Sequence, residues 1–451
     1  MKSVKSILTV SSLLICSFFF VVFIANAQAE PQWPENIGGM WDEWEKTAEK
    51  GVEGPLIGWH YYWRDGFHID SAEKNLKIRF NGRVLLDGGY IGADNELKRA
   101  FPDLEGGNIQ FRDLRVTMFG TLYDWMEFKF AMDFANVRDI KDEWIRFTKI
   151  PYIGPITLGH MKESFSLERL ASLENLTFME RALPTEAFAP GRNVGINHQI
   201  TLLNQQMTWA LGVFLNTGSF SEVGDSLDRI SEANGWDLTT RVTGLPYYEE
   251  SGKELLHVGL SYTHQFRGIE DTGAELRARP ESRLTDHRLV DTLEFVTQGM
   301  DIINTELAIV SGPLSLQGEY FHLFADSDEA DNPRFWGFYL YGSYIITGEH
   351  RNYDRSNGVF SRIKPNRDFH FFEGGWGALE VALRFSYIDL NGGAIRGGRE
   401  HDLTAGLNWY LNEKTRFMFN YIRAKAKDRE TPPPIEDGTA DILQVRFQII
   451  F

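Results

Sequence analysis

The sequence predicts an all-β fold: a transmembrane antiparallel β-barrel of about 16 strands, with a long loop folded into its lumen. Three observations lead to this prediction. Stretches of roughly ten residues alternate between apolar and polar side chains. Tight turns and longer polar connections join these stretches in alternation. After residue 29, no run of about 18 apolar residues could form a membrane-spanning helix.

The first 29 residues have the order of a secretory signal peptide. Two lysines precede a long apolar run, and "ANAQA" supplies small residues for cleavage before Glu30. An uncleaved membrane anchor is the alternative, and the A-x-A ending favours cleavage. The single cysteine, Cys16, lies in this segment, so we expect a mature chain without disulfides. Cleavage removes two lysines and no acidic residue, which changes the net charge from −17 to −19.

We expect residues 30–57 to form a short periplasmic segment and residues 58–451 to form the barrel. Alternation is strict over 126–134, 379–387 and 403–411. The length of these runs suits tilted strands of about 9–11 residues that cross a bilayer. In the first run, the even residues are apolar, and Glu127, Lys129 and Asp133 stand between them. The even residues of 126–134 are therefore predicted to face lipid.

The connections between the alternating runs fall into two classes. "LNEKT" and "GTLYDW" are tight, whereas 325–334, 389–401 and 426–439 are longer, polar and contain glycine or proline. Short turns at one end and long loops at the other are typical of outer-membrane barrels. A soluble β-sandwich or propeller is the competing fold. Charges within the long strands and aromatic residues near strand ends favour the barrel.

The end of the chain has the same pattern. The odd residues from Leu443 to Phe451 are apolar, and Gln444, Arg446 and Gln448 stand between them. We expect this strand to close the barrel, with its odd residues facing lipid. The terminal Phe451 resembles the signal that the outer-membrane assembly machinery reads in bacterial barrels, and that machinery is a predicted partner.

Four stretches resemble the phosphate-selective porins O and P family: 80–90, 111–136, 156–196 and 401–426. The short segments "YIITGE" and "IKP" are similar to segments of that family. The resemblance runs from about residue 60 to the C-terminus, and the block 156–196 is its most specific part. It implies a homotrimer of 16-stranded barrels in the bacterial outer membrane, with a narrow pore that cations line and that conducts anions.

The residues between Lys162 and Arg192 show no clear strand pattern. A loop of this length is usually functional or disordered, and its many apolar residues argue against disorder. Trimeric porins fold such a loop into the barrel, so we expect it to narrow the lumen. It would bring Lys162, Arg169, Arg181 and Arg192 to the pore. Bracing of the barrel wall is an equally open role for each single residue.

A second basic cluster occupies residues 275–288. Arginine suits phosphate and carboxylate because its planar fork donates two parallel hydrogen bonds. Arg277 and Arg279 match the family's arginine series in the pore, and Arg283 follows them. A solvated run of loop charges is the alternative. The inward-facing strand residues Arg115, Lys129 and Arg384 complete the set of predicted pore-lining cations.

Two departures from the family weaken the expectation of phosphate selectivity. Phosphate-specific members have a "K-x-G-R" pattern where this chain has residues 157–160, so that Thr157 replaces a lysine. Glu281 replaces an arginine after the "R-x-R-P" word. We therefore expect passive diffusion of small anions, with phosphate or polyphosphate as candidates, and only weak preference for phosphate. A general or cation-preferring porin and a structural or adhesive barrel are the alternatives.

Other function classes find little support in the sequence. Catalytic motifs such as G-x-S-x-G and H-E-x-x-H do not occur, and the histidines lack metal-ligand spacing. We therefore expect no enzymatic activity, no catalytic or metal site and no cofactor. A mature charge of −19 opposes general nucleic-acid binding. The expected partners are outer-membrane lipid, small anions, further copies of the chain and the assembly machinery.

Overall fold

The computed structural model describes residues 52–53, 59–135, 139–217, 235–267, 273–372 and 374–451. The predicted signal peptide lies outside the described residues. The predicted periplasmic segment 30–57 also lies outside them, apart from strand β1 (Val52–Glu53). Nothing tests these two boundaries, which remain predictions. Residues 53–451 form one unit, and the barrel belongs to it.

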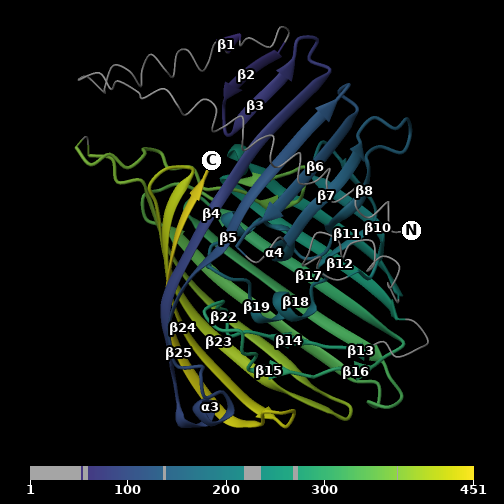
Figure 1. Ribbon diagram of the computed structural model, residues 1–451, viewed down its shortest axis with the longest axis vertical. Coiled ribbons are helices and arrows are strands. Elements are labelled where there is room, and N and C mark those ends of the chain that lie inside the picture. Colours follow the sequence, from purple (N-terminus) through teal and green to yellow (C-terminus); the bar gives the residue numbers. More distant parts are fainter. Residues whose placement is uncertain (1–51, 54–58, 136–138, 218–234, 268–272, 373) are drawn as a thin grey trace, which may run out of the picture. The chain divides into compact units, whose positions relative to one another are not determined.

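Within the described residues, sixteen strands form a closed antiparallel barrel, as predicted (Figure 1). Each strand pairs with the next along the chain, and β25 pairs with β4 to close the barrel. The wall consists of β4 (Leu76–Ala93), β5 (Gly106–Leu122), β6 (Met126–Asp133), β7 (Asp139–Phe147), β8 (Ile156–Lys162), β9 (Arg192–Leu202), β10 (Met207–Leu215), β11 (Gly235–Glu249), β12 (Glu254–Arg267), β17 (Gly299–Ser311), β18 (Leu314–Asp326), β19 (Arg334–Ile345), β22 (Ala378–Gly392), β23 (Ile395–Tyr410), β24 (Thr415–Arg429) and β25 (Ile435–Ile450).

Shorter elements lie outside the wall or inside the lumen. The hairpin of β2 (Trp59–Trp63) and β3 (Phe67–Ser71) continues the sheet along β4, next to the C-terminal end of β25. The remaining elements are α3 (Asn95–Ala100), α4 (Leu167–Leu170), η1 (Leu173–Asn175), α5 (Leu183–Phe188), η2 (Glu250–Gly252), β13 (Gly273–Ala274), β14 (Arg277–Ala278), β15 (Val290–Asp291), β16 (Phe295–Val296), β20 (Tyr353–Asp354) and β21 (Val359–Phe360).

Alternation along the strands separates an outer face from an inner face. On β25, the outward Leu443 is 63% exposed, whereas the inward Arg446 is fully buried. Phe451 extends the outer face, and its backbone exchanges two hydrogen bonds with Gly82 of β4. The parity predicted for 443–451 is therefore confirmed. Phe128 likewise packs outward over Gly120, while Lys129 lines the interior, as the pattern of 126–134 predicts.

Aromatic side chains form contacts on the outer face near both ends of the strands. Near the end that carries most short turns, the ring of Phe417 lies 6.2 Å from Trp409 and 5.1 Å from Phe447. Near the opposite end, Trp336 lies 5.0 Å from Tyr387 and 6.3 Å from Tyr320. Two aromatic girdles are typical of a barrel that crosses a bilayer. Among the helices in the described ranges, none has the length and apolar character needed to span a membrane.

We call the two ends of the barrel the turn end and the loop end. The turn end carries most of the tight connections, such as 123–125 and 411–414. The loop end carries the long connections from β8 to β9 and from β12 to β17. The predicted loops 389–401 and 426–439 are wrong in extent. Only Gly393 and Ala394 separate β22 from β23, because the polar residues around them continue the strand ladder. Backbone pairing satisfies the peptide groups of these strand ends, whatever their side chains.

The connection from β8 to β9, residues 163–191, folds into the barrel, and we call it the first inner loop. Its apolar side chains build a core inside the lumen. Phe165, Phe178 and Leu183 are buried against wall residues such as Phe321 and Tyr339. The loop thus packs on the wall formed by β18, β19 and their neighbours. Burial of these rings explains why a segment without strand pattern is ordered.

The second inner loop, residues 273–298, also folds inward from the loop end. Glu281 is 1% exposed and accepts hydrogen bonds from Ser386 and Thr404 of the wall. Arg384 is also 1% exposed, and its guanidinium forms ion pairs with Glu281 (2.5 Å) and with Glu168 of the first inner loop (3.3 Å). One buried arginine of β22 therefore holds both inner loops.

A second buried arginine fastens the first inner loop to the seam where β25 pairs with β4. Arg446 pairs with Asp87 of β4 (2.6 Å) and with Glu180 of the loop (2.7 Å). Arg112 of β5 pairs with the same Glu180 at 2.6 Å. Because these charges are buried, each needs its partners in place. The loop is thus fixed at several points around the wall.

The sequence pattern did not predict a third insertion. At the turn end, residues 346–377 connect β19 to β22, and we call them the turn-end segment. Its described residues reach across the mouth: Arg241 of β11 donates hydrogen bonds to the carbonyl oxygens of Asn357 and Gly358, and Arg355 donates to Asn204 and Gln205. The turn end is therefore partly covered from inside.

The buried contact between Arg384 and Glu281 leads to a testable expectation for stability. Glu281→Ala leaves Arg384 with the carboxylate of Glu168 and the carbonyl oxygen of Glu180, and it removes the acceptor of Ser386 and Thr404. Removing one partner of a buried ion pair costs about 3–5 kcal/mol, and we expect a loss near the lower end of that range. Urea unfolding of the purified barrel measures this loss.

The matched control is Arg277→Ala, in the same loop. Arg277 pairs with Glu275 and its side chain is 46% exposed. Exposed ion pairs contribute at most about 1 kcal/mol. Equal stability losses in the two variants would show that Glu281 does not anchor the loop.

Candidate functional site

The two inner loops fill one side of the lumen and leave a cavity on the other. The cavity has a volume of about 580 Å³ and follows the inner face of β4 to β9. Four residues of the first inner loop face this wall: Ser164, Leu170, Ser172 and Glu174. Asn357 and Arg362 of the turn-end segment line the cavity at the turn end. This space is the candidate path of a solute through the described part of the barrel.

Positive charge dominates the lining of the cavity. Eight cationic and three acidic side chains contribute to it. The cationic residues are Arg79, Arg83, Arg115, Lys129, Arg146, Lys162, Arg192 and Arg362; the acidic ones are Glu127, Asp142 and Glu174. A positive lining within low-dielectric walls concentrates anions.

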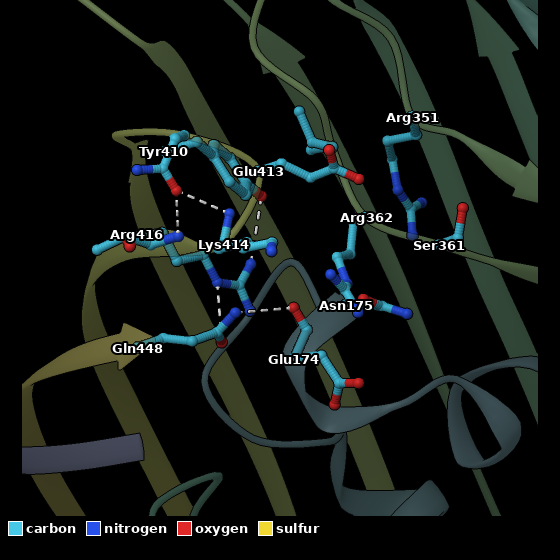
Figure 2. A pocket seen from close by; sticks show the side chains of 13 residues that line it. Glu174, Asn175, Arg351, Ser361, Arg362, Tyr410, Glu413, Lys414, Arg416 and Gln448 are labelled. Atoms are coloured by element: carbon cyan, nitrogen blue, oxygen red, sulfur yellow. Dashed lines mark hydrogen bonds between the residues drawn. The ribbon is translucent and has the colours of Figure 1, made fainter. Parts of the chain in front are cut away.

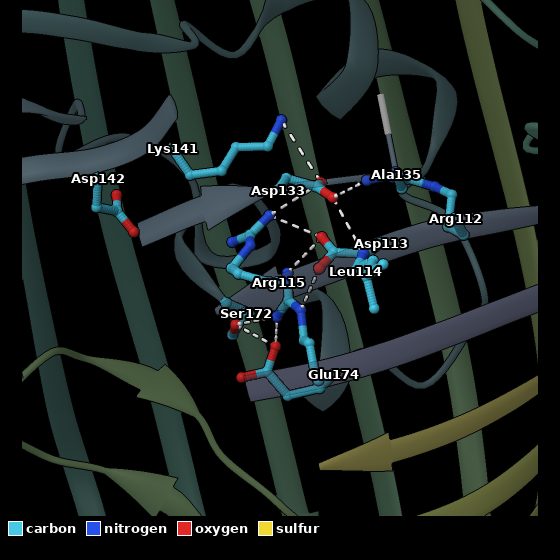
Figure 3. Close-up of polar contacts among 12 residues, drawn as sticks. Arg112, Asp113, Leu114, Arg115, Asp133, Ala135, Lys141, Asp142, Ser172 and Glu174 are labelled. Carbon is cyan, nitrogen blue, oxygen red and sulfur yellow. Dashed lines mark hydrogen bonds and ion pairs between the residues drawn. The ribbon is translucent and has the colours of Figure 1, made fainter. Parts of the chain in front are cut away.

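Carboxylates hold several of these cations in position (Figure 3). Asp113 is fully buried and accepts hydrogen bonds from Arg83 at 2.8 Å and from Arg115 at 2.7 Å. Strand pairing places Arg83 and Arg115 opposite each other on β4 and β5. Glu174 of the first inner loop also pairs with Arg83. Arg83 thus connects Asp113 of the wall to the tip of the first inner loop.

Asp142 of β7 has the same role for a second pair. Its two oxygens accept from Lys129 of β6 at 2.8 Å and from Arg192 of β9 at 3.0 Å. Asp142 is 7% exposed, so water has little access to its charge. A carboxylate shared between two cations leaves the pair with net positive charge toward the lumen.

Lys162 ends β8 at the start of the first inner loop. Its ammonium group donates to the carbonyl oxygens of Arg169, Leu170 and Ala171, at 2.7, 3.2 and 3.2 Å. The last carbonyls of the short helix α4 are thereby satisfied by a cation. Lys162 therefore both lines the cavity and braces the loop.

Of the residues predicted from sequence, Arg115, Lys129, Lys162 and Arg192 lie in this lining. The other six lie elsewhere in the barrel. Arg384 is buried between the inner loops, and Arg279 is 7% exposed and pairs with Glu186 and Asp286. Arg277 pairs with Glu275 and is half-exposed in the second inner loop. Their predicted contact with ions is not tested by these positions.

Arg169, Arg181 and Arg283 gather near the loop end of the path. Arg169 lies within electrostatic range of Arg181, Arg192 and Arg283. Arg181 donates to the carbonyl oxygens of Glu168 and Ala171, and Arg169 donates to that of Pro190, so both brace the first inner loop. Both roles considered for these residues, bracing and a positive field, are compatible with their places.

Four lining cations were missed from the sequence: Arg79, Arg83, Arg146 and Arg362. The first two could have been found, because residues 79, 81 and 83 of "RFNGR" share the inner face of β4. Arg146 could also have been found, because it lies opposite Glu127, which shares the inner face of β6 with Lys129. Arg362 could not have been found, since it belongs to the turn-end segment, whose inward course has no sequence signal.

A second, much smaller space lies where the loop tip meets the turn-end segment (Figure 2). Its volume is about 10 Å³, room for roughly one water molecule. Arg416 crosses it and donates to Gln448 (3.1 Å) and to the carbonyl oxygen of Leu176 (2.9 Å). These contacts hold the tip of the first inner loop against β24 and β25.

The chemistry of the site is that of ion contact. In the parts of the chain that the structure describes, no three His, Cys, Asp or Glu side chains are grouped to hold a metal ion. Thr157 and Glu281, which replace cations of the resembled family, have different surroundings. Thr157 lines the cavity and accepts a hydrogen bond from Arg146 at 2.9 Å, whereas Glu281 is buried away from it.

Two proteins with related sequences cover most of the chain. An uncharacterized protein of Caulobacter vibrioides is 26% identical over 385 residues, which cover 84% of this chain and 74% of that protein. Porin O of Pseudomonas aeruginosa is 24% identical over 432 residues, which cover 86% of this chain and 91% of Porin O.

Solved porin structures share the fold. The anion-selective porin from Comamonas acidovorans has a TM-score of 0.52 at 12% identity and covers 83% of this chain and 100% of its own. The outer membrane channel DcaP of Acinetobacter baumannii has a TM-score of 0.52 at 10% identity, with 85% and 99% covered. The family model "Phosphate-selective porin O and P" matches residues 84–451. The chain therefore belongs to the phosphate-selective porin O and P family.

Proposed function

We propose that this outer-membrane porin passes small anions by passive diffusion along the cavity between β4–β9 and the first inner loop. Family and fold make the chain a channel of the bacterial outer membrane rather than an enzyme. The excess of eight lining cations over three acids is the observation that supports anion passage. The net charge of the mature chain, −19, does not oppose it, because local charge decides which ion enters a pore.

We further propose a weak preference for phosphate over chloride. Arg115, Lys129 and Arg192 already share buried carboxylates, which reduces the charge they offer to a dianion. Thr157 supplies only a hydroxyl group where phosphate-specific relatives have a lysine. Competition between phosphate and chloride in single-channel current measures this preference.

Charge reversal at two unpaired cations tests anion passage. Among the described residues, neither Arg79 nor Arg362 forms an ion pair, so Arg79→Glu with Arg362→Glu should leave the wall intact. The change removes two positive charges from the lining and adds two negative ones. We expect the reversal potential in a KCl gradient to move toward cation passage, in purified channels in planar bilayers.

The control is Lys425→Glu on the outer face of β24, where Lys425 pairs with Asp437. It should leave the reversal potential unchanged. A parent channel that already prefers potassium would refute anion passage and leave a general or cation-preferring porin. Absence of any conductance would favour a structural or adhesive barrel.

A homotrimer is the proposed assembly. The trimer form of OmpT, an outer membrane protein of Vibrio cholerae, has a TM-score of 0.50 at 9% identity and covers 83% of this chain and 99% of its own. In this chain, Glu143 of β7 is exposed on the outer face, opposite Phe130. A carboxylate facing lipid is unfavourable, so the outer face of β7 suits contact with another copy.

Site-directed spin labelling tests this interface, because the predicted mature chain contains no cysteine. We expect a nitroxide at Glu143→Cys in lipid vesicles to be poorly accessible to dissolved oxygen. The matched position is Leu340→Cys, which is 57% exposed on β19, across the barrel, and should be highly accessible. Equal, high accessibility at both labels would place β7 in lipid and argue against this interface.

The assembly machinery is the remaining proposed partner. Phe451 is 42% exposed on the outer face, its ring lies over Gly82, and its backbone exchanges two hydrogen bonds with Gly82. Deletion of Phe451 should lower the amount of barrel inserted in cells while leaving the urea stability of inserted barrels nearly unchanged. Cell fractionation and unfolding measure the two effects. Normal insertion of the truncated chain would show that the terminal aromatic residue is not read.

A further inference from the structure

We infer that the wall of the cavity near the turn end forms a subsite for aromatic carboxylates, which rests on the proposed anion channel and names a solute class for it. The subsite combines two inward-facing rings, Phe119 and Trp144, with the guanidinium groups of Arg79 and Arg146.

Strand register places Arg79, Phe119 and Trp144 in one row with Lys129. Arg146 lies two residues after Trp144 on β7. Arg79 of β4 lies opposite Phe119 of β5, Phe119 lies opposite Lys129 of β6, and Lys129 lies opposite Trp144 of β7. Side chains directly opposite in antiparallel strands are about 5 Å apart at Cβ. Cation and ring therefore alternate along the wall, and all four side chains line the cavity.

The rings and guanidinium groups are in contact. The guanidinium carbon of Arg79 lies 5.5 Å from the ring centroid of Phe119, and that of Arg146 lies 4.8 Å from Trp144. The two rings meet edge to face, with centroids 6.2 Å apart and planes at 73°. Gly159 of β8 lies opposite Trp144 of β7 and has no side chain to cover the indole.

The place of these rings is unusual for a lumen. Inward-facing residues of a water-filled barrel are normally polar, and the neighbouring lining residues Asn81, Thr117 and Thr157 follow that rule. Phe119 and Trp144 do not belong to the apolar clusters of the described chain, which gather around the inner loops and the strands behind them. Their apolar surface is thus turned toward the solute path.

The cation beside the rings is available to a ligand. Among the described residues, Arg79 forms no ion pair, and its Nε, although buried, has no hydrogen-bond partner. By contrast, Lys129 is held by Asp142, and Arg146 donates to Thr157. An arginine without a carboxylate partner can bind one from solution through two parallel hydrogen bonds.

An aromatic carboxylate matches both halves of this wall. Its carboxylate would pair with Arg79, and its ring would pack against Phe119 and Trp144. Chloride, phosphate and acetate use only the cationic half. A volume of about 580 Å³ leaves room for such a solute beside water.

Channel block by benzoate tests the subsite. Purified full-length porin in planar bilayers carries a KCl current, and benzoate is compared with acetate, which lacks a ring, and with cyclohexanecarboxylate, which lacks aromaticity. We expect benzoate to reduce the current at concentrations at least about fivefold below those of acetate, with cyclohexanecarboxylate between them. Equal potency of benzoate and acetate in the parent channel would overturn the inference.

Two variants test whether the preferential block by benzoate arises at the proposed subsite. Phe119→Leu with Trp144→Leu should bring the benzoate-to-acetate ratio close to one. Arg79→Gln should raise the blocking concentrations of both benzoate and acetate. The ratio between the two concentrations should change less than in the double leucine variant. Trp125→Leu, on the outer face beside Phe147, is the matched control. It should change neither the two blocking concentrations nor their ratio. Heat-dependent gel mobility confirms that each variant is folded.

The outcomes separate this inference from the proposed function. An anion-selective parent channel in which the double leucine variant keeps the full benzoate preference would refute the subsite alone, and the rings would then only brace Arg79 and Arg146. A cation-selective parent channel would refute anion passage itself, and the subsite with it.

Discussion

The path through this barrel depends on the burial of Arg384. Its guanidinium lies on the face of Phe178, 4.4 Å from the ring centroid, and pairs with one carboxylate from each inner loop. A guanidinium removed from water needs such partners, because an unpaired buried charge costs several kcal/mol. Both loops are therefore drawn to the wall around β22. The cavity lies along the opposite wall because the loops occupy this one.

Buried ion pairs also organise the wall that lines the cavity. Asp113 and Asp142 are buried, and each serves two cations. Shared carboxylates fix the cations without cancelling them, so the lining keeps a positive excess. This arrangement explains how a strongly acidic chain can have a basic lumen. The field that a solute meets is set by the side chains within a few ångström of it, since more distant surface charges are screened.

The structure gives Glu281 a different role from the one that the family pattern suggests. From the sequence it appears as the loss of a pore arginine. In the structure it is buried, accepts hydrogen bonds from Ser386 and Thr404, and neutralises Arg384. Its carboxylate therefore contributes to loop anchoring rather than to the lining of the cavity. The case for weak phosphate preference then rests on Thr157 and on the shared carboxylates, not on Glu281.

The sequence by itself determined the barrel, its strand parity and its family. Alternation with period two fixes which side chains share a face, because successive Cβ atoms of a strand point to opposite sides. It therefore placed Leu443 outside and Lys129 inside, and it could have placed Arg79 and Arg83. It could not distinguish inward cations that line the cavity, such as Arg115, from those under a loop, such as Arg384.

Only the tertiary structure decided that distinction, together with the inward course of residues 346–377. Arg384 finds Glu168 across 216 positions of chain, and Arg446 finds Glu180 across 266. No local pattern encodes such pairings. Burial of apolar rings places the first inner loop against one part of the wall. The charged side chains beside these rings are then buried as well, so each needs a partner at that place in the wall.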